Sequence, residues 1–97
     1  MRRLAGIPLT VEYTNTARKE FLQLAKTDGN ALQEDLEILA LTGIGQIEPL
    51  EGTKRVFKLR SGRTRAEFIV IQTEHCLTVI RVFYRQEGYK TKGRSRR

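Results

Sequence analysis

Apolar residues stand at every second position of segment 7–13, and this alternation predicts a β-strand with one buried face. The apolar positions are Ile7, Leu9, Val11 and Tyr13. Pro8 lies near the start of the segment, where a strand tolerates a proline. Residues 14–16, Thr-Asn-Thr, then offer several candidate N-caps for a helix that follows.

Two segments with the spacing of amphipathic helices come next. The first has its apolar positions at Ala17, Phe21, Leu24 and Ala25, and the second has them at Leu32, Leu36, Leu39 and Ala40. We expect Asp28-Gly29 to end the first helix, and Asn30 to cap the second with Gln33 as its reciprocal partner. Gly43 and Gly45 are expected to end the second helix. The link between the two predicted helices, at Asp28-Gly29, is short, and a short link predicts an antiparallel helical hairpin.

Three further strands are predicted at about 55–60, 63–72 and 76–84. Gly62 turns the chain between the first two, and residues 73–75 turn it between the last two. The order β-α-α-β-β-β predicts an α+β fold, an antiparallel meander with the helical hairpin packed on one face. We expect a single domain at 1–89 and a basic C-terminal tail at 90–97.

Basic residues gather on one face of the predicted meander. If Phe57, Phe68 and Ile80 face the helices, strand parity turns five cations to the other face, with Glu67 as their only nearby acid. These cations are Lys58, Arg60, Arg65, Arg81 and Arg85. Like charges on adjacent strands repel each other, and an anionic partner would relieve this repulsion. We therefore favour a phosphate-binding face over a merely solvated surface.

The charge distribution points the same way. The chain has a net charge of +7, but residues 1–53 carry −3 and residues 54–97 carry +10. With one Cys and one His, a Cys/His zinc site is excluded, and we expect His75 to be exposed in a turn. No apolar run of signal or membrane length follows Arg2-Arg3, so we expect a cytoplasmic protein.

Four stretches in this order resemble the RelE/ParE toxins of bacterial and archaeal toxin–antitoxin modules. They are YTNTARKEFLQL, LEG, FKLRSGRTRAEF and RVFYRQEGY, and the resemblance runs from about Val11 to Tyr89. The most specific part is the L-R-x-G-x-x-R element from Leu59 to Arg65. In this superfamily the RelE branch cleaves mRNA in the ribosomal A site, whereas the ParE branch inhibits DNA gyrase without hydrolysis.

The resemblance implies a set of catalytic residues. Carried over one by one, they are Lys58, Arg65, Arg85 and Tyr89, and this set favours the RelE-like branch. The residues expected to bind RNA are Lys54, Arg60, Arg63, Arg81 and Tyr84. Some relatives have a second lysine where this chain has Val56, and Lys54 is the candidate substitute. Tyr84 also has the parity of a core residue, and Tyr89 is alternatively a packed C-terminal anchor.

The implied reaction is attack of a ribose 2′-OH on the adjacent phosphate, with no metal or cofactor. Arg65 and Arg85 would stabilise charge on the phosphoryl oxygens. Lys58 would serve as the base only if the clustered cations favour its neutral form. The implied partners are a cognate antitoxin and a ribosome with mRNA in its A site. The alternatives are a ParE-like gyrase inhibitor and a non-toxic basic module that binds nucleic acid.

Overall fold

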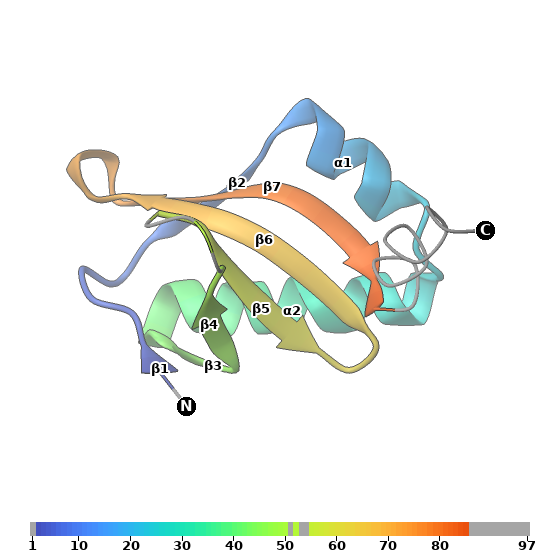
Figure 1. Cartoon of the computed structure of the whole chain (residues 1–97), viewed down its shortest axis with the longest axis horizontal. Coiled ribbons are helices and arrows are strands. Elements are labelled where there is room, and N and C mark those ends of the chain that lie inside the picture. The colour runs from blue at the N-terminus through green and yellow to red at the C-terminus, as the bar shows by residue number, and fades with distance from the viewer. Residues whose placement is uncertain (1, 51, 53–54, 86–97) are drawn as a thin grey trace.

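The sheet and the helices of the protein occupy separate layers in the computed structural model, which describes residues 2–50, 52 and 55–85 (Figure 1). The strands are β1 (Arg2–Arg3), β2 (Thr10–Tyr13), β3 (Ile44–Gly45), β4 (Ile47–Pro49), β5 (Phe57–Ser61), β6 (Thr64–Ile71) and β7 (Cys76–Tyr84). The helices are α1 (Asn15–Leu22) and α2 (Lys26–Thr42), and a 3₁₀ turn spans Gln72–Glu74.

The main sheet has the strand order β2-β7-β6-β5-β4. Strands β4 to β7 pair antiparallel, whereas β2 joins β7 in parallel. Strands β1 and β3 form a separate antiparallel pair. Helix α2 crosses behind the sheet, and α1 lies along the β7 side (Figure 1). The predicted α+β fold, with an antiparallel meander and two helices, is confirmed.

The predicted boundary between the helices is wrong. Helix α2 begins at Lys26, so Asp28 and Gly29 lie inside it, and Asn30 caps nothing. Gly29 is buried, and a Cβ built on it would come 3.3 Å from Cε1 of Phe21. Gly29 therefore lets the Phe21 ring pack closely where the two helices meet, and a Cβ there would require the ring to shift by a few tenths of an ångström. The predicted end at Gly43 is confirmed, because Gly43 has the left-handed backbone of a helix C-cap, with φ of 80°.

The core lies between α2 and the sheet. Leu32, Leu36 and Leu39, the predicted stripe of α2, are fully buried. From the sheet they meet buried side chains of β5, β6 and β7, namely Leu59, Ala66, Phe68, Leu77, Val79 and Val82. Phe57 stacks on Phe68 with 5.7 Å between ring centroids. The hydrophobic spacing of the chain thus selects the buried face of each element.

A β-bulge changes the parity of β7. Glu67 pairs with Arg81 but the next residue, Phe68, pairs with Val79, so Ile80 is an extra residue on β7. Leu77 and Val79 therefore face α2 before the bulge, and Val82 does so after it. The expectation that Ile80 faces the helices together with Phe68 is wrong. Beyond the bulge, Arg81 is left on the other face, as expected.

Candidate nucleic-acid interface

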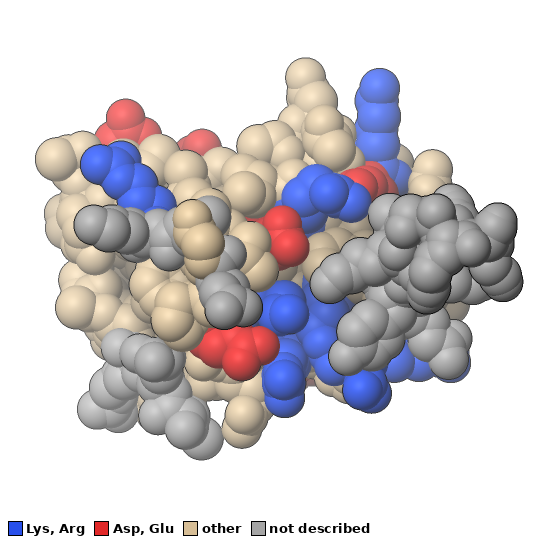
Figure 2. All heavy atoms as spheres, in the orientation of Figure 1, with Lys and Arg blue, Asp and Glu red and all other residues tan. Residues whose placement is uncertain are grey.

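We call the sheet surface opposite α2 the open face. Toward the β5–β6 turn it carries two cross-strand rows: Glu48, Lys58, Glu67 and Arg81 in one, and Arg60, Arg65 and Phe83 in the other. In Figure 2, Lys and Arg atoms gather toward the end of β5 and β6 that carries their turn, with acidic atoms beside them. The sheet thus concentrates cations at one end of this face.

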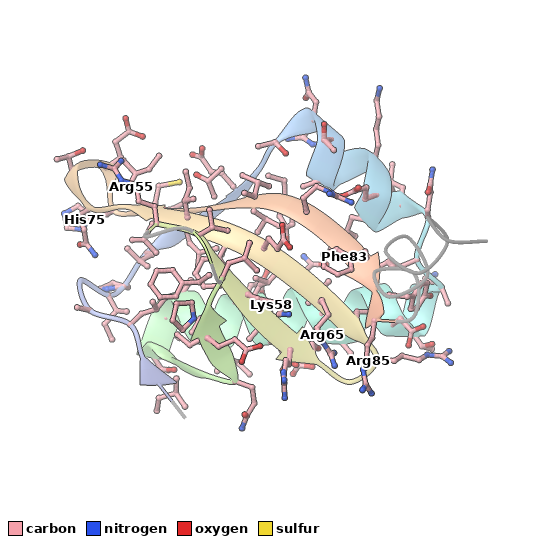
Figure 3. The ribbon with its side chains drawn as sticks, in the orientation of Figure 1. Arg55, Lys58, Arg65, His75, Phe83 and Arg85 are labelled. Carbon is pink, nitrogen blue, oxygen red and sulfur yellow. The ribbon has the colours of Figure 1, made fainter. Side chains whose placement is uncertain are left out.

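Lys58, Arg65 and Arg85 lie on a diagonal across three strands. Lys58 pairs with Glu67, two residues after Arg65. The backbone N–H of Arg85, directly after β7, donates to the carbonyl of Arg63, two residues before Arg65, at 2.8 Å. Successive members are therefore diagonal neighbours, whose Cα atoms lie about 7–8 Å apart in a regular sheet. Figure 3 shows the three in a slanting row that runs from Lys58 near the middle of the sheet toward Arg85 at the end of β7.

The turn between β5 and β6 fixes the Arg65 guanidinium. Nη1 of Arg65 donates to the carbonyl of Gly62 at 2.9 Å and to that of Thr64 at 2.7 Å. Gly62 has a left-handed backbone, with φ of 59°, which a tight hairpin turn requires. Because these two carbonyl acceptors already restrict its rotamers, Arg65 loses less conformational freedom when it binds an anion.

Acidic residues accompany the cations of the open face. Oε2 of Glu48 lies 3.7 Å from Nζ of Lys58 and 3.6 Å from Nη2 of Arg60. The expectation that Glu67 is the only nearby acid is wrong. Glu48 belongs to β4, a three-residue edge strand that ends in a proline. The hydrophobic alternation of the sequence does not indicate this strand. Such exposed ion pairs each contribute about 0.2–1 kcal/mol.

Arg81 is held by α1. Its Nε donates to Oε2 of Glu20 at 2.9 Å, and Oε1 of Glu20 accepts from the backbone N–H of Val82 at 2.7 Å. Pairing of β2 with β7 ends at Tyr13 and Val79, so Glu20 covers the edge of β7 beyond that point. Arg81 thus has a structural contact, and its predicted RNA-binding role stays a prediction.

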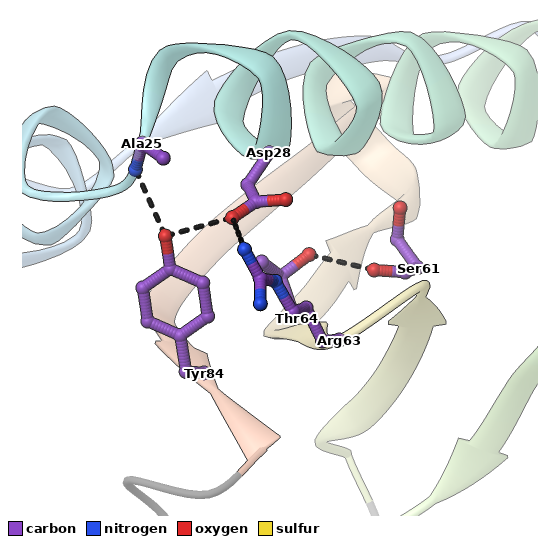
Figure 4. A network of polar contacts seen from close by, with 6 residues as sticks. All are labelled: Ala25, Asp28, Ser61, Arg63, Thr64 and Tyr84. Atoms are coloured by element: carbon purple, nitrogen blue, oxygen red, sulfur yellow. Dashed lines mark hydrogen bonds and ion pairs between the residues drawn. The ribbon is translucent and has the colours of Figure 1, made fainter.

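Arg63 and Tyr84 meet at the start of α2 (Figure 4). The Tyr84 hydroxyl donates to Oδ2 of Asp28 at 2.9 Å and accepts from the backbone N–H of Ala25 at 2.9 Å. Nη2 of Arg63 lies 3.2 Å from the same Asp28 oxygen. The hydrogen bond from Tyr84, with Arg63 beside it, lowers the pKa of Asp28. These contacts tie the ends of β6 and β7 to the helix, and RNA contact by either residue stays a prediction.

A second pair of contacts anchors the turn of β5 and β6. The buried Ser61 hydroxyl donates to Oδ2 of Asp35 on α2 at 2.6 Å. The hydroxyl of buried Thr64 donates to the Ser61 carbonyl at 2.8 Å (Figure 4). Because Ser61 and Thr64 flank the turn, its backbone is fixed from the helical side while Arg60 and Arg65 extend from the open face.

Several predicted residues fall away from this cluster. Lys54 and Tyr89 lie outside the described residues, as does the predicted tail at 90–97. His75 is exposed beside the 3₁₀ turn, as expected, at the far end of the sheet from Arg65 (Figure 3). Within the described ranges, no three or more His, Cys, Asp or Glu residues are placed to hold a metal ion. Nor does that part of the chain contain a helix long and apolar enough to cross a membrane.

Phe83 is not among the site residues predicted from the sequence. It pairs with Arg65 across β6 and β7, on the open face. The guanidinium carbon of Arg81 lies 5.6 Å from the centroid of its ring. Phe83 alternates with Arg81 and Arg85 along the sequence, so the alternation alone indicates that its aromatic side chain lies among the cations.

Comparison with known proteins identifies the fold. No protein-family model and no curated protein matches the chain. Among solved structures, the toxin–antitoxin complex RelBE2 from Mycobacterium tuberculosis matches with a TM-score of 0.73 and 24% identity, over 86% of this chain and 97% of that one. The isolated Escherichia coli RelE toxin matches with a TM-score of 0.66 and 24% identity, over 90% and 97%. The intact E. coli RelBE complex matches with a TM-score of 0.61 and 26% identity, over 78% and 95%.

These matches confirm the fold that the resemblance to RelE/ParE toxins implies. The five-stranded sheet with two helices is the RelE toxin fold. At 24% to 26% identity the likeness is one of fold, and the same fold can carry different chemistry.

Proposed function

We propose that the protein is the toxin of a type II toxin–antitoxin module and acts as a ribosome-dependent mRNA endonuclease. The RelE fold supports the first part, because the neighbours include toxin–antitoxin complexes from several organisms. One observation carries the second part: Lys58, Arg65 and Arg85 lie on one diagonal of the open face, opposite α2. An RNA strand crossing β5, β6 and β7 along this diagonal would meet all three cations.

The reaction that suits this arrangement is attack of a ribose 2′-OH on the adjacent phosphate, which releases the 5′-oxygen of the next nucleotide. Charge builds up on the phosphoryl oxygens in the transition state. Guanidinium groups make paired hydrogen bonds to such oxygens, so Arg65 and Arg85 stabilise that charge. Arg65 is suited to this role because the turn already fixes one of its nitrogens.

Lys58 contacts the phosphate or accepts the 2′ proton. The carboxylate of Glu48 lies 3.7 Å from its Nζ, so an incoming phosphate competes with Glu48 for this lysine. If Lys58 is the base, it has to leave this ion pair and release its own proton first, because an ammonium group has no lone pair to accept the 2′ proton. Tyr89 then orients the nucleophile or stacks on a base, and Lys54 contributes to the phosphate contacts.

The partners follow from this chemistry. The ribosome holds mRNA in a reactive geometry, so cleavage of free RNA is expected to be poor. The antitoxin silences the toxin, and an acidic segment would complement the open face. The complexes of RelE-like toxins with RelB antitoxins support such a partner. We place the protein in the cytoplasm, as a single domain at 1–89 with a basic tail at 90–97.

Ribosomes programmed with mRNA provide the test. We expect Arg65→Ala to lower the cleavage rate roughly 10²–10³-fold, the usual effect of removing one transition-state donor. Arg55→Ala is the matched control, because Arg55 is exposed and lies at the far end of the sheet (Figure 3). Equal cleavage by wild type and Arg65→Ala would remove Arg65 from the mechanism. Absence of cleavage by the wild type would refute the nuclease assignment.

A further inference from the structure

Phe83 places an aromatic ring among the cations of the open face. Its neighbour Val82 is 2% exposed and faces α2, so Phe83 points to the other side of the sheet. The residue is half-buried, whereas the aromatic pair on the helical side, Phe57 and Phe68, stacks in and beside the core. Hydrophobic burial under the helices therefore does not account for Phe83.

The surroundings of Phe83 suit a nucleobase. Arg65 is its direct cross-strand partner, and Arg60 follows in the same row. Bases stack on aromatic rings whatever their identity, and proteins that bind single-stranded RNA combine such rings with cations that contact the backbone. A single nucleotide can then present its phosphate to Arg65 and its base to Phe83.

The ring is also held in place. The guanidinium of Arg81 lies 5.6 Å from its centroid, within the range of a cation–π contact. Arg81 is itself fixed by Glu20 at 2.9 Å. A ring that is ordered before binding loses less conformational freedom when a base stacks on it. This contact gives Arg81 a role on the open face besides its ion pair with Glu20.

We propose that Phe83 is the stacking platform for a base of the bound RNA, next to the phosphate held by Arg65. The proposal rests on the proposed function, because it assigns the ligand of the same face. It makes Phe83 a binding residue that sets the position of the substrate. Removing a stacking side chain of this kind lowers affinity roughly 5- to 150-fold.

The test uses a 2′-O-methylated RNA hexanucleotide that contains 2-aminopurine, whose fluorescence falls when it stacks. We expect the wild-type protein to quench the probe and Phe83→Leu to lose the quenching, with affinity reduced 5- to 150-fold. Phe83→Tyr, which keeps a ring, is expected to retain both. Ile69→Ala is the matched control, since Ile69 is an apolar residue of the open face in β6, opposite Thr78 and four residues beyond Arg65.

Equal quenching by wild type and Phe83→Leu would overturn the proposal, as would a Phe83→Tyr variant that behaves like Phe83→Leu. Cleavage on programmed ribosomes separates this proposal from the nuclease assignment. If wild type cleaves and Phe83→Leu cleaves with unchanged kcat and KM, the stacking proposal fails and the nuclease assignment stands. If wild type quenches through Phe83 but cleaves nothing, the stacking proposal stands and the nuclease assignment fails.

Discussion

Replacing Glu48 by Gln should tighten RNA binding and lower the free energy of unfolding. Glu48 pairs with Lys58 at 3.7 Å and with Arg60 at 3.6 Å, on a face that we propose binds phosphates. The amide of Gln has nearly the shape of the carboxylate but no charge. The change therefore makes the two cations available to an anion without altering the strand.

The structure gives the magnitude of both the loss in unfolding free energy and the gain in RNA affinity. The side chains of Lys58, Arg60 and Glu48 are 29%, 57% and 43% exposed, so solvent screens the pairs and their joint loss costs about 0.5–1 kcal/mol of unfolding free energy. A phosphate on Lys58 would lie about 7 Å from the Glu48 carboxylate, where repulsion in water is about 0.6 kcal/mol. Its removal should tighten RNA binding about threefold.

Fluorescence anisotropy of a 2′-O-methylated RNA oligonucleotide, titrated at several salt concentrations, measures the predicted gain. We expect Glu48→Gln to bind more tightly at low salt and to show a steeper salt dependence, by up to about 0.7 in the log–log slope for each additional phosphate contact. Glu34→Gln is the control, because it removes the same charge from an exposed position on α2. Binding by Glu48→Gln that equals Glu34→Gln, or is weaker than wild type, would refute an RNA-binding role for this face.

Three further changes probe the scaffold and the site. Tyr84→Phe removes the hydroxyl that joins Asp28 and the Ala25 N–H, so thermal melting should move down by a few degrees, and an unchanged melting temperature would show that the network does not stabilise the fold. The pKa of Asp28 is lowered in the folded protein, so its contribution is present above the unfolded pKa of about 4 and is lost as pH falls through the folded value. Acid titration of Asp28→Asn should lack that loss, and the same acid dependence as wild type would contradict it. Phe68→Ala empties a fully buried position and should cost about 3–5 kcal/mol by urea unfolding, whereas a loss below about 1 kcal/mol would mean that the core is not packed as described.

The sequence predicts the parts of the fold that depend on local spacing. The α2 stripe of Leu32, Leu36 and Leu39 follows from helical periodicity, and its burial needs no knowledge of the partner strands. The rows on β5 and β6 follow from a tight turn at Gly62, which fixes the parity of both strands. Lys58 and Arg65 could therefore be assigned to one face before the structure was known.

The misses share one cause, which is contact between segments distant in the sequence. Asp28-Gly29 reads as a helix end, yet Asp28 accepts a hydrogen bond from Tyr84, 56 residues away, and the helix continues through both residues. The bulge at Ile80 depends on how β6 and β7 pair, which alternation within one strand does not reveal. Glu48 reaches Lys58 because β4 adds to the sheet edge, and so short a strand leaves almost no periodic signal.

The central claim is that the open face cuts mRNA on the ribosome, and mapping of cellular transcripts by primer extension after brief expression tests it most directly. We predict cuts in phase with codons in cells that express the wild-type protein, uncut transcripts with Arg65→Ala, and arrest of translation before any DNA damage. Intact transcripts together with early DNA damage in cells that express the wild type would contradict the claim and favour a gyrase inhibitor.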